Sequence, residues 1–290
     1  MLALMMRILT LLAFATLAHA AEPDAPRYAL EPVAGKVHRF TAGHYHSAIL
    51  ATREGILVTD PVDPEAAEWL KAELARRFDA PIRYLVYSHN HFDHTLGGRV
   101  FDDPSITCVA HEFVREDLVA TRTDTRLPDL SFRDGVTLHL GDHRVRLRHH
   151  GPNNGRGSVS MKFEPDDVMF VVDWIVLGRM PYKDLKGYDI QGMIHSTREV
   201  LDEDFATFVG GHGKAGTKED VARYLRYLET LQARVVEGRR AGRTVEQLQR
   251  EIRLDEFRDL DRYEEWLPLN IAGVARILDD QSYLDMQLEE

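Results

Sequence analysis

The sequence of 290 residues contains a single cysteine, Cys108. One thiol cannot form a disulfide within the chain, and it cannot supply a four-cysteine zinc site or a Cys-x-x-Cys redox pair. Cross-links are not required, because a chain of this length buries roughly 75% of its unfolded surface when it folds. With 44% apolar and 29% charged residues, the composition is that of a globular protein.

An excess of basic charge is also lacking. The chain has 36 Lys and Arg against 47 Asp and Glu, which gives a formal net charge of −11. Nucleic acids and anionic membranes bind basic patches, so neither is expected as the main partner. The motifs Gly-x-Ser-x-Gly, Ser-x-x-Lys and Gly-x-x-x-x-Gly-Lys-Ser/Thr are absent from the sequence. We therefore expect a small-molecule substrate and no serine nucleophile.

Long hydrophobic runs are absent except at the N-terminus. Arg7 precedes the apolar residues 8–18, which are too short to span a bilayer comfortably, and Ala18-His19-Ala20 is a small-x-small cleavage site. This pattern predicts a signal peptide over residues 1–20 and a periplasmic or secreted protein that has no membrane partner after cleavage. The alternative is an uncleaved anchor.

The rest of the chain alternates predicted strands and helices, with no repeats and no low-complexity linker. Short apolar runs predict strands at residues 48–51, 55–59, 82–87, 106–110, 136–140, 145–148, 158–163, 168–172 and 207–209. Capping residues such as Asp63 and Thr217 predict helices at residues 64–78, from 112, 189–201, 217–239 and 244–290. This order predicts a layered α/β domain with mixed sheets over residues 21–240. A helical extension over 241–290 is expected to pack on this domain or to mediate a dimer.

Histidine is unusually frequent, with 14 residues, and the densest cluster follows the predicted strand 82–87. It comprises His89, His91, Asp93 and His94. Alternating positions of an extended segment point the same way, so His89 and His91 can share one metal, while Asp93 and His94 face a second. Imidazole and carboxylate suit zinc, and also iron or manganese. The alternative, a solvated histidine-rich loop, is not expected where a buried strand ends.

The pattern His-x-His-x-Asp-His resembles the metal-binding motif of the metallo-β-lactamase superfamily. Four further segments resemble that family, in the same order along the chain: Val58-Thr59-Asp60-Pro61, Thr95-Leu96-Gly97-Gly98, Val171-Val172-Asp173 and Gly210-Gly211-His212-Gly213. The resemblance covers about residues 35–235. It implies an αββα sandwich of two mixed sheets, with the site at one edge of the facing sheets.

The resemblance also implies the metal ligands. Two of the three histidines of the first metal site correspond to His89 and His91, and the second site to Asp93, His94 and His212, with Asp173 bridging the two. Taken alone, Asp173 could be a turn residue at a strand end and His212 a loop histidine. Their order and spacing after the first motif favour the ligand interpretation.

The chain departs from the family at the third ligand of the first site. Aligning Gly157-Ser158 with the family pattern puts Asn154 where a histidine is usual. An amide oxygen binds zinc more weakly than imidazole does. Three outcomes remain open: Asn154 ligates weakly, His150 or His149 substitutes for it, or the first site is empty or labile. Asn154-Gly155 is equally consistent with a plain turn.

These residues predict a metal-dependent hydrolase with one or two zinc ions. A metal lowers the pKa of bound water, and the resulting hydroxide attacks an ester, lactone, thioester or amide, a β-lactam included. Asp93 is the expected catalytic residue, binding metal and orienting the hydroxide. The alternatives are a mononuclear iron oxygenase of the same fold and a non-catalytic relic that decayed at Asn154. His44 and His46, in a loop expected to overhang the site, are candidate substrate contacts.

Overall fold

The structure is a computed structural model that describes residues 27–282. The predicted signal peptide and residues 283–290 of the predicted extension lie outside the described residues. Within residues 27–282, none of the helices combines the length and the apolar character that a bilayer crossing requires.

Seven strands form the first sheet, in the order β1-β2-β3-β4-β5-β6-β7. The first four pair antiparallel and the last four parallel, so the sheet is mixed. The strands are β1 (Tyr28–Ala34), β2 (Val37–Ala42), β3 (Tyr45–Ala51), β4 (Ile56–Thr59), β5 (Ile82–Val86), β6 (Thr107–His111) and β7 (Leu130–Phe132).

Five strands form the second sheet, in the order β12-β11-β10-β9-β8. The predicted hairpins at 141–142 and 165–167 are confirmed, and only β11 and β12 pair parallel. The strands are β8 (Gly135–Leu140), β9 (His143–His149), β10 (Val159–Glu164), β11 (Val168–Val171) and β12 (Thr207–Gly210).

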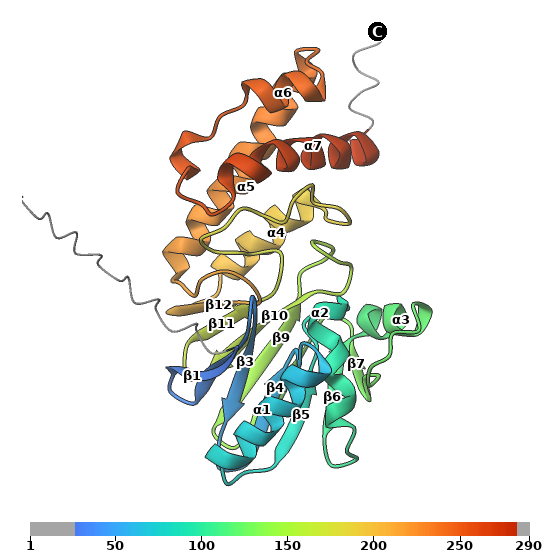
Figure 1. Ribbon diagram of the computed structural model, residues 1–290, viewed down its shortest axis with the longest axis vertical. Helices are drawn as coiled ribbons and strands as arrows, with labels where there is room; N and C mark the ends of the chain where they lie inside the picture. The colour runs from blue at the N-terminus through green and yellow to red at the C-terminus, as the bar shows by residue number, and fades with distance from the viewer. Residues whose placement is uncertain (1–26, 283–290) are drawn as a thin grey trace, which may run out of the picture.

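Helices cover the outer face of each sheet (Figure 1). The first sheet is covered by α1 (Pro64–Arg77), α3 (Glu112–Ala120) and the short elements α2 (Phe92–Thr95) and η1 (Leu96–Phe101). The second is covered by α4 (Ile190–Leu201) and α5 (Lys218–Arg240), and α6 (Val245–Glu251), η2 (Asp255–Phe257) and α7 (Tyr263–Ser282) pack beyond them. The predicted helix starts at Asp63 and Thr217 are confirmed, since both side chains cap.

The strand residues alternate between two hydrophobic layers, as the period of two requires. In β3, Ala48 and Leu50 face the second sheet, whereas Ile49 and Ala51 face α1. In β11 the side chains likewise alternate between the layer that separates the two sheets and the layer that faces α4 and α5. The molecule is therefore an αββα sandwich of two mixed sheets, and the predicted fold class is confirmed.

The predicted helical segment from residue 244 onward is confirmed within the described residues, where it is divided into α6 and α7. Residues 252–262 form only the 3-10 turn η2. Buried Leu254, Phe257 and Leu260 turn this segment onto α5, where the Phe257 ring lies 5.3 Å from that of Tyr227. The backbone N–H and C=O of Asp261 pair with Gly178 and Met180 instead of with a helical neighbour, which an unbroken helix would not allow.

Candidate metal centre and substrate cleft

The ends of four strands bring the predicted site residues together. Strands β4 and β5 run parallel and end before Asp60 and His89, and β11 and β12 run parallel and end before Asp173 and His212. The backbone N–H of His46 donates to the carbonyl of Gly211 at 2.8 Å, which joins the two sheets at this edge. The carboxyl ends of parallel strands meet at one edge, so ligands from distant segments converge there.

One carboxylate oxygen of Asp173 lies close to a first group of three predicted site residues. Its Oδ2 lies 3.1 Å from His89 Nε2, 2.9 Å from His91 Nδ1 and 3.3 Å from the amide nitrogen of Asn154. Asp173 and His89 are buried, whereas His91 is half-buried. The carboxylate is thus surrounded by nitrogen atoms from two separate segments.

The second group lies on the other side of the same carboxylate. His94 and His212 face each other with their Nε2 atoms 3.2 Å apart, and Asp93 Oδ2 lies 3.7 Å from both. The Nδ1 of His212 donates to the backbone oxygen of His44 at 3.1 Å, which directs its Nε2 at the centre. Oδ1 of Asp173 is buried without a well-aligned hydrogen bond and lies 3.1 Å from His212 Nε2. A buried carboxylate oxygen of this kind, beside converging imidazole rings, fits a bound cation.

The protonation states of His89, His94 and Asp173 suit a metal, whereas at His91 and His212 burial opposes protonation but Asp173 raises the pKa. Burial lowers the pKa of His89, and it holds that of His94 well below its usual value, so both imidazoles are neutral. Burial opposes ionisation of Asp173, yet His89, His212 and His91 together keep its pKa well below the ordinary range. Neutral imidazole and ionised carboxylate are the forms that bind metal.

Two strand-end aspartates hold strained backbone conformations at this edge. Asp60 has φ +36° and Asp173 has φ +70°, in the left-handed region that side chains other than glycine rarely adopt. Such strain persists where the surrounding structure enforces it, and it is frequent at functional sites.

The comparisons with known proteins agree with this geometry. The family described as the metallo-beta-lactamase superfamily matches residues 41–212, which contain every group of the centre. The chain belongs to the metallo-β-lactamase superfamily. A metallo-beta-lactamase from Pontibacter korlensis shares the fold with a TM-score of 0.62 at 18% identity, covering 70% of this chain and 99% of that one. The 2,4-dinitroanisole O-demethylase subunit alpha of Nocardioides sp. (strain JS1661) is 23% identical over 242 residues, 82% of this chain and 71% of that protein.

Asp60 lies behind the candidate metal centre, and it was named from the sequence only as part of a segment that resembles the family. Its carboxylate accepts hydrogen bonds from the Ser88 backbone at 2.8 Å and from the Ser88 hydroxyl at 2.6 Å, and that hydroxyl lies 2.8 Å from His89 Nδ1. Burial raises the pKa of Asp60 to about 7, against the effect of both hydrogen bonds. Asp60 therefore orients His89 through Ser88. Its position just after the buried strand β4 was the available signal.

The structure places Asn154 at the centre but turns its amide nitrogen toward it. The amide oxygen accepts a hydrogen bond from Ser158 at 2.8 Å, while the nitrogen donates to Asp173. His150 is not brought to the centre, because its two ring nitrogens lie 2.7 Å from Glu199 and 2.7 Å from Ser160. His149 likewise bonds elsewhere, to the carbonyl of Arg156.

The two candidate substrate histidines have different positions. His44 lines the cleft above the centre and holds His212 through its carbonyl. His46 is directed away, with Nδ1 3.1 Å from the Thr41 hydroxyl, and burial lowers its pKa to about 4. Of the two, only His44 is placed to contact a substrate.

A cleft of about 470 Å³ opens over the metal centre. Its walls carry Asp93 and Asp173 together with aromatic rings and two cations: Tyr45, Phe92, Tyr182, Tyr188, Arg179 and Lys186. Phe92 is 68% exposed, which is unusual for a phenylalanine and places its ring at the mouth. Sequence reasoning missed this wall, although the density of tyrosine, lysine and arginine in residues 179–188 was a signal.

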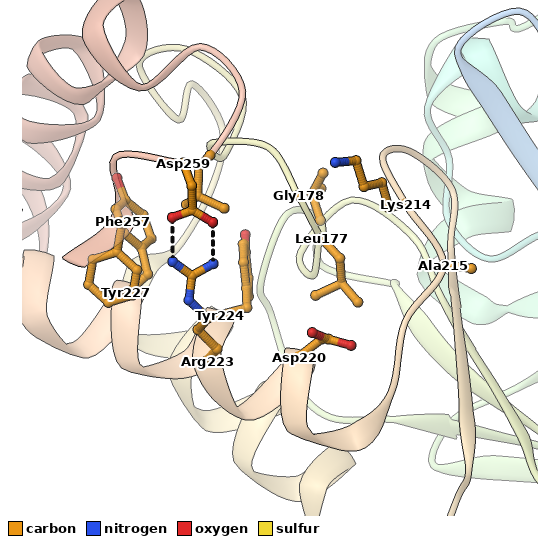
Figure 2. Close-up of a pocket in the computed structure, with 12 residues that line it drawn as sticks. Leu177, Gly178, Lys214, Ala215, Asp220, Arg223, Tyr224, Tyr227, Phe257 and Asp259 are labelled. Atoms are coloured by element: carbon orange, nitrogen blue, oxygen red, sulfur yellow. Dashed lines mark hydrogen bonds and ion pairs between the residues drawn. The ribbon is translucent and has the colours of Figure 1, made fainter. Parts of the chain in front are cut away.

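A second cavity of about 210 Å³ lies between α5 and the loops beside it (Figure 2). Arg223 and Asp259 face each other there through two hydrogen bonds of 2.6 and 3.1 Å. The residues that line this cavity include none of the groups of the metal centre, and Val176 is shared with the cleft.

Proposed function

We propose that this protein is a metal-dependent hydrolase of an ester, lactone, thioester or amide, including a β-lactam. The observation that supports it most is the buried carboxylate of Asp173, on which imidazole nitrogens of His89, His91 and His212 converge at 2.9–3.1 Å at the floor of an open cleft. The position of Asp93 at the boundary between this centre and the cleft supports it further.

The residues present fit a divalent metal, with zinc first and iron or manganese as alternatives. Two overlapping sets would hold it: His89, His94 and Asp173, and Asp93, His94 and His212. When bound, such an ion lowers the pKa of a coordinated water and polarises a carbonyl oxygen. His94 belongs to both sets, so we propose that it is the indispensable ligand.

The chain's own side chains supply orientation and proton handling. Asp93 is partly exposed to the cleft, and its Oδ2 can hold the proton of an attacking water between the two imidazoles of His94 and His212. Asp60 and Ser88 fix the ring of His89, and the His44 carbonyl fixes that of His212. Aromatic rings line the remainder of the cleft.

A second candidate is hydrolytic cleavage of an aryl alkyl ether. Water would add to the ring carbon that bears oxygen, and the alcohol would leave with one proton, so that a phenol and an alcohol are formed. The name of the Nocardioides relative, an O-demethylase of 2,4-dinitroanisole, favours this candidate. The aromatic lining of the cleft is compatible with it.

The deciding experiment is metal analysis combined with turnover. The protein is purified without added metal, its metals are measured before and after zinc loading, and hydrolysis of phenyl acetate, a thioester, a lactone and a β-lactam is followed. One or two zinc ions with zinc-dependent turnover support the proposal. Bound iron without hydrolysis would overturn the proposal in favour of an iron oxygenase. If no metal bound after loading, the protein would be a non-catalytic relic.

The variant Asn154→His tests how many zinc ions each chain binds. An imidazole at this position, beside Asp173 Oδ2, would complete a three-histidine set with His89 and His91. We expect a second zinc ion to bind more tightly, which calorimetric titration measures. An unchanged stoichiometry and affinity would contradict the alignment of Asn154 with the missing histidine.

Export to the periplasm is part of the same proposal. It is supported by the N-terminal sequence pattern, and N-terminal sequencing of protein recovered from the periplasm of a Gram-negative host should begin at Ala21.

A further inference from the structure

Arg179 is a cation in the cleft wall that has no acidic partner. Within residues 27–282 it forms no salt bridge, although most arginines of this acidic chain do, and its Nε is buried without a hydrogen-bond partner. The side chain lines the same cleft as Asp93 and Asp173. A guanidinium left unpaired beside a candidate active site has donors available for a ligand.

A tryptophan from the C-terminal helix holds this arginine. The guanidinium carbon lies 5.3 Å from the centre of the Trp266 ring, and Tyr182 packs edge-on against the same ring at 5.5 Å. Two backbone hydrogen bonds of 3.0 Å tie the loop to Asp261, one from Met180 N–H and one to the carbonyl of Gly178. Trp266 thus supports both a charged and an aromatic part of the wall.

The charges of the cleft favour an anion. Asp93 and Asp173 are the carboxylates that line it, and one divalent ion would offset both. The full charges that remain on the lining side chains are those of Arg179 and Lys186. The rings of Tyr45, Tyr182 and Tyr188 around them provide apolar faces for a flat group.

We propose that the substrate is an aromatic compound with an anionic substituent, that Arg179 binds this substituent, and that Trp266 is the positioning residue for Arg179. The inference rests on the proposed function, because it places the substrate in the same cleft. Arginine presents several donors in one plane, which matches a carboxylate or sulfonate, whereas exposed Lys186 contributes only a flexible charge.

The test is a binding measurement that needs no turnover. The full zinc-loaded chain is titrated calorimetrically with benzenesulfonate, with neutral benzyl alcohol and with aliphatic methanesulfonate. We expect benzenesulfonate to bind more tightly than either of the other two. Arg179→Gln should weaken benzenesulfonate about 10- to 100-fold, the range for a lost charged hydrogen bond, and leave benzyl alcohol unchanged. Arg198→Gln, which removes an exposed charge from α4, is the matched control.

Trp266 is tested with two variants. Trp266→Phe keeps an aromatic face and should retain most of the affinity for benzenesulfonate, whereas Trp266→Leu should lose several-fold of it while benzyl alcohol and zinc content stay the same. Equal losses for both ligands would show that Trp266 only maintains the fold. That result would overturn its positioning role.

The outcomes separate this inference from the proposed function. If the zinc protein hydrolyses esters but benzenesulfonate binds no better than benzyl alcohol, or equally well to Arg179→Gln, the anion site is wrong and the hydrolase stands. If benzenesulfonate binds through Arg179 but no substrate is hydrolysed, the anion site stands and the hydrolase fails.

Discussion

The metal centre and the cleft wall above it are built in opposite ways. The centre consists of buried or half-buried side chains whose polar atoms lie 2.9–3.7 Å from one another: His89, His91, Asp93, His94, Asp173 and His212. The wall, residues 176–188 with Trp266, consists of aromatic faces and of cations that lack carboxylate partners. The centre is organised to hold a cation, and the wall has groups available for a ligand. Variants in the two regions should therefore have separable effects.

The largest expected effect is that of His94→Ala in the centre. His94 is fully buried and belongs to both candidate metal sets. Its loss should lower hydrolysis by about a thousandfold or more, because metal polarisation of substrate and water supplies several kcal/mol. Asp93→Ala should abolish hydrolysis while the fold remains. Circular dichroism and elemental analysis accompany the rate measurements, and full activity of either variant would contradict the mechanism.

Asp60→Asn should have an intermediate effect on the same region. The substitution keeps the shape of the side chain but presents an amide group to the Ser88 hydroxyl, which orients His89. Removing a group that orients a ligand typically costs about 10- to 100-fold in metal affinity. Chelator competition measures this, with Asp124→Asn, an exposed residue in the Arg99 ion pair, as control. An affinity equal to that of the control would show that Asp60 is only structural.

The comparison also explains what the sequence could predict. The centre was predictable because its groups follow apolar strands in a recognisable order, and because β4 with β5 and β11 with β12 run parallel to one edge. The alternation of strands and helices predicted a layered α/β domain with mixed sheets, and the resemblance to the family implied the αββα sandwich. Local sequence carried most of this information.

The wall was not predicted, because its arrangement depends on tertiary packing between distant segments. Arg179 of the cleft packs against Trp266 of α7, a contact that local sequence does not specify. The same holds for the residues near the first metal site. The Ser158 hydroxyl donates to the amide oxygen of Asn154, and His150 forms a hydrogen bond with Glu199 of α4. A sequence pattern specifies residue types, but it does not specify which partner each side chain finds.

Gly273→Ala should perturb the wall without touching the centre. A Cβ at this position of α7 would clash with the backbone oxygen of Asp184, in the loop that carries Tyr182. We expect a loss of about 1–3 kcal/mol in the free energy of unfolding, typical of overpacking, together with a higher KM and unchanged zinc content. Urea unfolding and steady-state kinetics measure these, with exposed Asp280→Ala as control on the same helix. Loss of zinc would show that wall and centre are not separable.

The smallest expected effect concerns a half-buried histidine just outside the centre. Burial lowers the pKa of His46 to about 4, from 6.5, so between these values the unfolded chain binds a proton that the folded chain does not. His46 therefore costs no stability above pH 6.5, and it lowers the free energy of unfolding as the pH falls from 6.5 toward 4, by about 1.4 kcal/mol per pH unit at most. His46→Gln should reduce that slope in urea unfolding of the zinc-loaded protein, whereas exposed His139→Gln should leave it unchanged. If the free energy of unfolding of His46→Gln and of the parent chain depended on pH in the same way, His46 would be protonated in the folded state. The predicted lowering of its pKa by burial would then be wrong.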